Sequence, residues 1–125
     1  THSTFVIDLT AALIRVLSNM VINAFEATDP GGTVSVGVAL TDHMICFSVW
    51  NREPIPPAVQ VRIFQRNFST KAESGRGLGT YSMKLFGEHL LRGRVDFTSN
   101  ADQGTTFRIR LPLVMEEPSS LGSGA

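Results

Sequence analysis

Two asparagines four residues apart, Asn19 and Asn23, have the residue type and spacing that most favour chemistry in this sequence. They lie in the run Leu17–Ala27, whose apolar positions recur with the period of a helix. At that spacing two helical residues share one face, a turn apart. Buried amides need hydrogen-bond partners, so a pair beside an apolar stripe suits the edge of a ligand pocket. Two exposed asparagines, or one bonded to a neighbouring loop, would give the same pattern.

A second candidate site is the glycine-rich segment Gly75–Gly79, which enters a helical pattern. Glycines let backbone N–H groups approach an anion closely, and the start of a helix favours negative charge. Phosphate is therefore the ligand that this segment favours, and a surface loop ending in a helix cap is the alternative. The glycine spacing fits neither a dinucleotide fingerprint nor a P-loop.

Aromatic and basic residues precede these glycines in the segment Arg62–Lys71. Phe64 and Phe68 could anchor a loop to the core. Lys71, Arg66 or Arg76 could neutralise phosphate charge. Core aromatics beside a solvated basic face would give the same composition.

The elements that must position these groups follow from periodicity and turn residues. We expect helices from about residue 8 or 10 to 28, over 58–64 and over 78–91, and strands over 4–7, 33–40, 44–50, 94–99 and 105–113. Helices and strands mix without strict alternation, which favours one α+β domain. This domain is expected to be a two-layer α/β sandwich, a mixed sheet with helices on one face. It is expected to cover residues 1–114, followed by a disordered tail over 115–125.

Composition argues against several classes of protein. The 125 residues are 42% hydrophobic, which suits one domain with a core. Eleven basic residues balance eleven acidic ones, so no basic field favours nucleic acid. The single cysteine, Cys46, cannot form an internal disulfide and is expected in the core. No apolar run approaches the length of a membrane span and no signal peptide is visible, so we expect a cytoplasmic domain excised from a longer protein.

Four segments, in this order, resemble the catalytic, ATP-binding domain of sensor histidine kinases. LSNMVINAFEAT is similar to the N box of that family, IFQRNFSTK to its F box, GRGLGTYSMKLF to its second glycine box and GTTFRIRLP to its closing strand. The family shares a Bergerat-type nucleotide fold with gyrase, a heat-shock chaperone and a mismatch-repair ATPase. The resemblance extends from about Asp8 to Leu113.

The resemblance implies that ATP and Mg²⁺ are the ligands. Asn23 would coordinate Mg²⁺ through its amide oxygen, and Asn19 would support the phosphate side. Residues 69–76 would form a lid that orders over ATP. The other positions implied to contact the nucleotide are Asn51, Ile55, Lys71, Gly75, Arg76, Gly77, Leu78, Gly79 and Thr106, with Thr105 as the alternative to Thr106.

One segment departs from the family pattern. The family has Asp-x-Gly-x-Gly before Ile-Pro, and that aspartate accepts a hydrogen bond from the adenine amino group. Here the residues before Ile55 contain neither aspartate nor glycine. Counting back without a gap places Trp50 at the aspartate position, and allowing one deletion places Asn51 there. Because an indole only donates, as the adenine amino group does, we expect Asn51 to be the acceptor, with weaker adenine selectivity than an ionised group.

The resemblance implies phosphoryl transfer rather than hydrolysis. In the hydrolytic relatives a glutamate stands four residues before the Mg²⁺ asparagine, and here that position is Asn19, which is no base at neutral pH. Catalysis would rest on positioning and charge neutralisation, with Asn19 as the catalytic position. None of His2, His43 and His89 stands in a phosphoacceptor motif. The acceptor histidine is therefore expected on an upstream dimerisation domain.

The implied function is that of the ATP-binding catalytic domain of a two-component kinase. Its further partner would be a response regulator, and the parent would be a homodimer that is cytoplasmic or membrane-anchored. The fragment itself is expected to be monomeric and of low activity. The alternatives are a degenerate nucleotide-binding or docking module and a serine kinase of the same fold that inhibits a sigma factor, while a gyrase-type hydrolase fits least.

Overall fold

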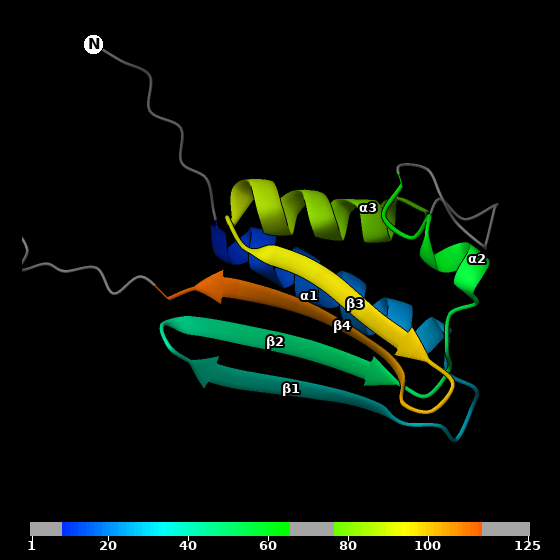
Figure 1. The fold of residues 1–125 in the computed structure, drawn as a ribbon. Coiled ribbons are helices and arrows are strands. Elements are labelled where there is room, and N and C mark those ends of the chain that lie inside the picture. The colour runs from blue at the N-terminus through cyan, green and yellow to red at the C-terminus, as the bar shows by residue number, and fades with distance from the viewer. Residues whose placement is uncertain (1–8, 66–76, 114–125) are drawn as a thin grey trace, which may run out of the picture.

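A sheet and a layer of helices make up the computed structural model, which describes residues 9–65 and 77–113. The helices lie together on one face of a four-stranded sheet (Figure 1). In chain order the elements are α1 (Leu9–Glu26), β1 (Val34–Thr41), β2 (Met44–Asn51), α2 (Pro57–Gln60), α3 (Gly77–Leu85), the π-helical turn η1 (Phe86–Leu90), β3 (Arg94–Asn100) and β4 (Gly104–Pro112). The predicted two-layer α+β architecture is confirmed.

The sheet has the strand order β1-β2-β4-β3. All three pairings are antiparallel, so the described strands do not form the mixed sheet that was predicted. The turn between β1 and β2 places Asp42 and His43 at φ 39° and 65°. Left-handed residues at both central positions match the right-handed twist of a tight hairpin.

The core lies between the sheet and α1. Every fourth residue of α1, namely Ala12, Val16, Met20 and Ala24, is buried. The last three of these side chains pack with Val49 on β2, Met83 on α3 and both Phe107 and Ile109 on β4. An aromatic cluster of Phe64, Phe97 and Phe107, with ring centroids 5.3 to 6.2 Å apart, closes one side of this core. The segment after α2 is thus anchored at Phe64.

By length and composition alone, α1 could cross a membrane, in contrast to the expectation from the sequence. Such a test does not separate a membrane span from the core helix of a globular domain. The buried stripe of α1 packs on the sheet, as it would in a core helix.

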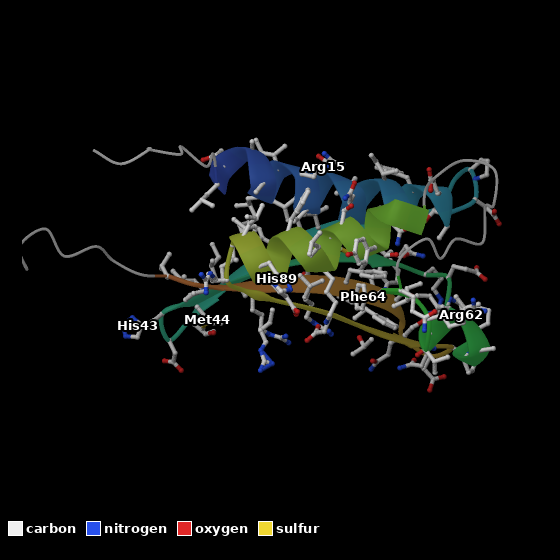
Figure 2. The ribbon with its side chains drawn as sticks, turned by 90° about the horizontal axis from the view of Figure 1, so that it is seen from above. Arg15, His43, Met44, Arg62, Phe64 and His89 are labelled. Carbon is white, nitrogen blue, oxygen red and sulfur yellow. The ribbon has the colours of Figure 1, made fainter. Side chains whose placement is uncertain are left out.

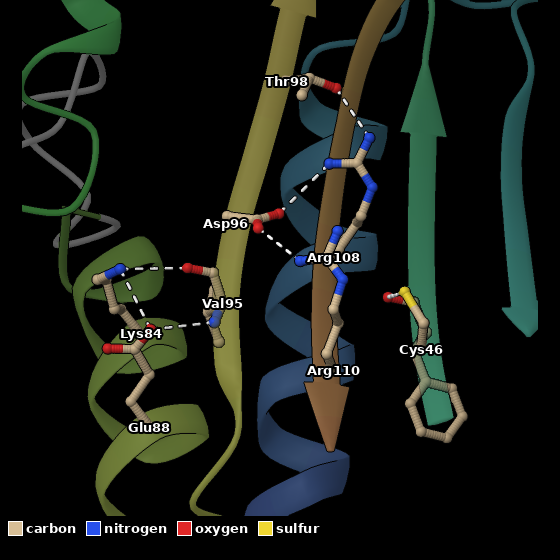
Figure 3. Close-up of polar contacts among 9 residues, drawn as sticks. Cys46, Lys84, Glu88, Val95, Asp96, Thr98, Arg108 and Arg110 are labelled. Atoms are coloured by element: carbon tan, nitrogen blue, oxygen red, sulfur yellow. Dashed lines mark hydrogen bonds and ion pairs between the residues drawn. The ribbon is translucent and has the colours of Figure 1, made fainter. Parts of the chain in front are cut away.

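Side chains from the helix layer form hydrogen bonds with backbone groups of β3 at the edge of the sheet (Figure 3). Lys84 Nζ donates to the Val95 carbonyl at 3.1 Å, and the Val95 N–H donates to Glu88 Oε2, also at 3.1 Å. Burial raises the pKa of the Glu88 carboxyl, but the hydrogen bonds from Val95 and Lys84 outweigh it and hold that pKa below its ordinary value. The edge groups of Val95 are therefore not left open for another strand.

The face of the sheet away from the helices is polar at β3 and β4. Asp96 forms ion pairs with Arg108 and Arg110, with N–O distances of 3.3 and 2.6 Å. The carboxylate raises the pKa of the Arg110 guanidinium. Cys46 lies opposite Arg110 and is only partly buried, so its predicted place in the core is wrong. The alternation of β2 assigns it to the outer face.

The two later helices differ from prediction in their extent. The helix expected over 58–64 is a single turn, α2, followed by turn residues over 61–64. The helix expected over 78–91 is α3, which widens into η1 from Phe86 onward. The predicted strand over 4–7, the predicted lid over 69–76 and the tail over 115–125 lie outside the described residues.

Candidate nucleotide-binding site

The sequence-predicted site residues come from elements that meet at one end of the molecule. The end of α1, the end of β2 and the start of α3 all lie at that end, beside α2 (Figure 1). The Nδ2 atom of Asn19 donates to the Gly79 carbonyl at 3.3 Å. This bond joins the asparagine helix to the glycine segment across 60 residues of sequence.

Asn19 and Asn23 are both half-buried on one flank of α1. The buried stripe of α1 faces the sheet, and the asparagines lie beside it on the flank from which Asn19 reaches α3. Within residues 9–65 and 77–113 the Asn23 amide makes no side-chain hydrogen bond. A half-buried amide that has no hydrogen-bond partner in this part of the chain is suited to binding a ligand.

Asn51 and Trp50 are successive residues of β2, so their side chains point to opposite faces of the sheet. Asn51 is 4% exposed and faces the helix layer, as does its neighbour Val49 on the same face. Trp50 faces the opposite side, where its indole Nε1 donates to the Gln103 carbonyl at 2.6 Å. Of the two residues that the sequence left at the aspartate position, Asn51 is the one on the side of the site.

The two threonines that open β4 are separated in the same way. Thr105 is 1% exposed and lies opposite Asn51, whereas Thr106 lies opposite Trp50 on the outer face. Thr105, and not Thr106, therefore shares the face of the sheet that carries Asn51. The deciding signal in the sequence was Phe107, an apolar core residue that shares its face with Thr105.

Sequence reasoning missed Ser99, on β3. Its hydroxyl accepts a hydrogen bond from the Ile55 N–H at 2.7 Å and lies 2.7 Å from the Thr105 hydroxyl. Ser99 has the same strand parity as Val95 and Phe97, which face the helix layer. That parity is the signal by which it could have been found.

The start of α3 is held in place by two polar contacts. The Thr80 hydroxyl is buried and donates to the Ile63 carbonyl at 2.6 Å, which ties α3 to the segment after α2. The Gly79 carbonyl receives the bond from Asn19. Gly77 and Leu78 form the first turn of this helix, while Lys71, Gly75 and Arg76 lie outside the described residues.

No group of three or more histidine, cysteine or acidic side chains that could hold a metal ion is found among the residues described. At this end of α1, Asn19 and Asn23 offer amide oxygens and Glu26 offers a single carboxylate. A cation here would therefore have to share its coordination with oxygens of the ligand and with water, as Mg²⁺ commonly does beside phosphates.

Two of the three histidines, His43 and His89, lie among the described residues. His43 lies at the hairpin between β1 and β2, at the opposite end of the sheet from Phe64 and Arg62 (Figure 2). His89 is exposed on η1.

Known proteins resemble this chain in sequence and in structure. The heme sensor protein HssS of Staphylococcus aureus (strain JH9) is 35% identical over 102 residues, which are 80% of this chain and 22% of HssS. The chain thus spans about a fifth of the curated relatives it matches. The nucleotide-free catalytic domain of the histidine kinase ThkA is 31% identical, with a TM-score of 0.72 over 82% of this chain and 66% of that one. Full-length ShkA in complex with AMPPNP is 26% identical, with a TM-score of 0.71 over 84% of this chain and 22% of that one.

The resemblance found in the four sequence segments is confirmed by a match to a whole family. The family described as histidine kinase-, DNA gyrase B-, and HSP90-like ATPase matches residues 8–115, most of the chain. This range contains every described residue of the site. The chain belongs to the family of histidine kinase-, DNA gyrase B- and HSP90-like ATPases.

Proposed function

We propose that this chain is the catalytic domain of a sensor histidine kinase and that it transfers the γ-phosphoryl group of MgATP to a histidine on another domain. The observation that carries the proposal is the hydrogen bond from Asn19 to the Gly79 carbonyl. It brings the asparagine helix against the first turn of α3, whose backbone N–H groups and dipole favour phosphate. The parent protein would act as a cytoplasmic or membrane-anchored homodimer, with a response regulator as its next partner.

Asn23 is the residue that we assign to Mg²⁺. Its amide oxygen is a hard donor, and the side chain has no hydrogen-bond partner among the described residues. One amide cannot hold the ion alone, so phosphate oxygens and waters would complete an octahedral shell. Bound there, Mg²⁺ would neutralise charge on the phosphates.

The amide side chain of Asn19 favours transfer of the γ-phosphoryl group over hydrolysis of ATP. Hydrolysis needs a group that takes a proton from water, and an amide is no such base at neutral pH. The Nδ2 atom of Asn19 is instead committed to Gly79. Its role would be to fix the phosphate-binding backbone relative to α1, so that an incoming histidine, itself a nucleophile, meets a positioned phosphoryl group.

A phosphotransfer assay tests this function. The domain is mixed with radiolabelled MgATP and a separate acceptor domain of a sensor kinase. We expect acid-labile label on the acceptor histidine, and none when that histidine is replaced by glutamine. Intact MgATP binding without any label on the acceptor would contradict the proposal, and label on a serine-containing acceptor would favour the serine kinase instead.

A binding module without transfer is the second candidate function. The loop that replaces the first glycine box is braced rather than flexible, because Arg52 donates to the Ala101 and Asp102 carbonyls at 2.6 and 3.1 Å. A braced loop could limit nucleotide entry and leave a surface that only docks partners. Calorimetry decides between the two, since undetectable MgATP affinity would favour the docking module.

Gly79→Ala should stabilise the ligand-free protein and weaken MgATP binding. A Cβ atom at Gly79 would meet no described atom within 4 Å, so nothing in the described fold requires glycine there. Alanine in a helix is more favourable by roughly 0.5–1 kcal/mol. If the space is kept for phosphate, the added methyl group should cost at least about tenfold in MgATP affinity, close to 1.4 kcal/mol.

Urea unfolding without ligand and thermal-shift titration with MgATP measure the two effects separately. The control is Gly37→Ala on β1, which should leave MgATP affinity unchanged. Unchanged affinity in the Gly79 variant would mean that the ligand does not approach this turn of α3.

A further inference from the structure

A chain of hydrogen bonds links the ends of three strands beside the buried Asn51. The Ile55 N–H donates to Ser99 Oγ at 2.7 Å, and Ser99 Oγ lies 2.7 Å from Thr105 Oγ1. Thr105 Oγ1 donates to the Glu53 carbonyl at 2.7 Å, and Asn51 Nδ2 donates to the same carbonyl at 3.4 Å. Two backbone groups and three side chains thus form one connected network.

Chemistry fixes the direction of every bond in this network. A carbonyl oxygen only accepts, so Thr105 must use its single proton on Glu53. Ser99 must then donate its own proton to Thr105, and its lone pair accepts the Ile55 N–H. The short distance between the two hydroxyls would allow either donor, but the backbone groups at the two ends leave one arrangement.

The Glu53 carbonyl, which can only accept, also fixes the orientation of the Asn51 amide. Its nitrogen must face the Glu53 carbonyl, because the reversed amide would set two oxygens against each other. The Oδ1 atom then faces the other way, with no hydrogen-bond partner among the described residues. An aspartate has two acceptors and is insensitive to such a rotation, whereas an asparagine must be held to present an acceptor rather than a donor.

We propose that Ser99 and Thr105 are positioning residues. By holding the Ile55 N–H and the Glu53 carbonyl in place, they keep the acceptor that turns the Asn51 amide with its oxygen toward the bound base. This fixed orientation makes the site select adenine, whose exocyclic amino group donates, over guanine, whose corresponding oxygen accepts. A freely rotating amide would serve either base. This inference rests on the proposed nucleotide-binding function and adds the source of its base selectivity, which is a neutral hydrogen-bond network in place of a charged acceptor.

The test compares the dissociation constants of MgATP and MgGTP by calorimetry. We expect the wild-type chain to bind MgATP at least about tenfold more tightly than MgGTP, as one mismatched buried hydrogen bond requires. Ser99→Ala and the isosteric Thr105→Val should each reduce this ratio to less than about threefold. Ser99→Thr keeps the hydroxyl and should keep the ratio.

The same substitutions made in the Asn51→Asp variant distinguish a loss of side-chain orientation at position 51 from a general loosening of the site. In Asn51→Asp the carboxylate presents an acceptor in either orientation, so adding Ser99→Ala should no longer change the ratio. If Ser99 had only a structural role, Ser99→Ala would weaken the binding of MgATP and MgGTP equally in both backgrounds. The ratio of the two dissociation constants would then stay unchanged, and this result would overturn the inference. If either alanine or valine variant unfolds, Thr105→Ser, which retains the hydroxyl, must keep the wild-type ratio for the inference to stand.

The proposed function and this inference fail in different ways. Equal binding of MgATP and MgGTP by the wild-type chain would overturn the inference alone and leave a nucleotide-binding domain without base selectivity. Binding of neither nucleotide would overturn the proposed function and the inference with it.

Discussion

Asn23→Ala should remove most of the stabilisation of this domain by MgATP while leaving the free energy of unfolding of the ligand-free protein almost unchanged. The side chain is half-buried and makes no hydrogen bond within the described ranges, so its removal breaks no bond of the described fold. As the proposed protein ligand of Mg²⁺, it should be worth at least about 100-fold in MgATP affinity, the upper end of the loss for an outer-shell partner of a metal.

The expected size of the effect follows from linkage. At a MgATP concentration about 100 times the wild-type dissociation constant, bound ligand stabilises the protein by about 2.7 kcal/mol. A variant that binds about 100-fold more weakly would gain only about 0.4 kcal/mol at that concentration. A thermal-shift titration resolves this difference easily.

Two controls assign the effect to the metal. Ser18→Ala removes an exposed polar side chain from the same helix and should leave the MgATP shift intact. With ATP in excess EDTA, wild type and Asn23→Ala should bind nucleotide alike, since the missing ligand then has no ion to hold. An unchanged MgATP shift in Asn23→Ala would remove Asn23 from the site.

Strong periodicity explains what the sequence could predict. Leu17–Ala27 carries a helical stripe so regular that its face toward the core, and hence the flank holding Asn19 and Asn23, followed directly. The four strands of the described sheet were predicted to within about a residue of their observed ends, while the strand predicted over 4–7 lies outside the described residues. In both cases local pattern and tertiary packing favour the same structure.

Strand parity explains what the sequence left open. Whether Trp50 or Asn51, and Thr105 or Thr106, faces the site depends on which face of the sheet the helices cover, a tertiary fact. Ser99 escaped notice because a serine in an alternating strand has no chemical signature of its own. Its importance comes from neighbours 44 and 6 residues away in sequence.

Gly87→Ala should destabilise the protein by about 1–3 kcal/mol, the usual cost of forcing an extra methyl group into a packed core. Gly87 is buried in η1, where the helix layer passes over β3 and β4. A Cβ atom there would clash with the Cγ2 methyl of Val95 and lie 3.1 Å from Cδ1 of Ile109. Those two side chains are 1% and 0% exposed, so neither can turn toward solvent.

A double-mutant cycle shows whether this contact is the cause. Val95 is β-branched and stiff, so it cannot yield by changing rotamer, but Val95→Ala removes the clashing methyl altogether. The double variant Gly87→Ala/Val95→Ala should therefore be more stable than the sum of the single effects predicts, with a coupling of roughly 1–2 kcal/mol by urea unfolding. Gly79→Ala is the matched control, because a Cβ atom at that position of the preceding α3 meets no described atom within 4 Å and should stabilise the helix. If the cycle is additive, the glycine is not required by the packing of this turn on β3.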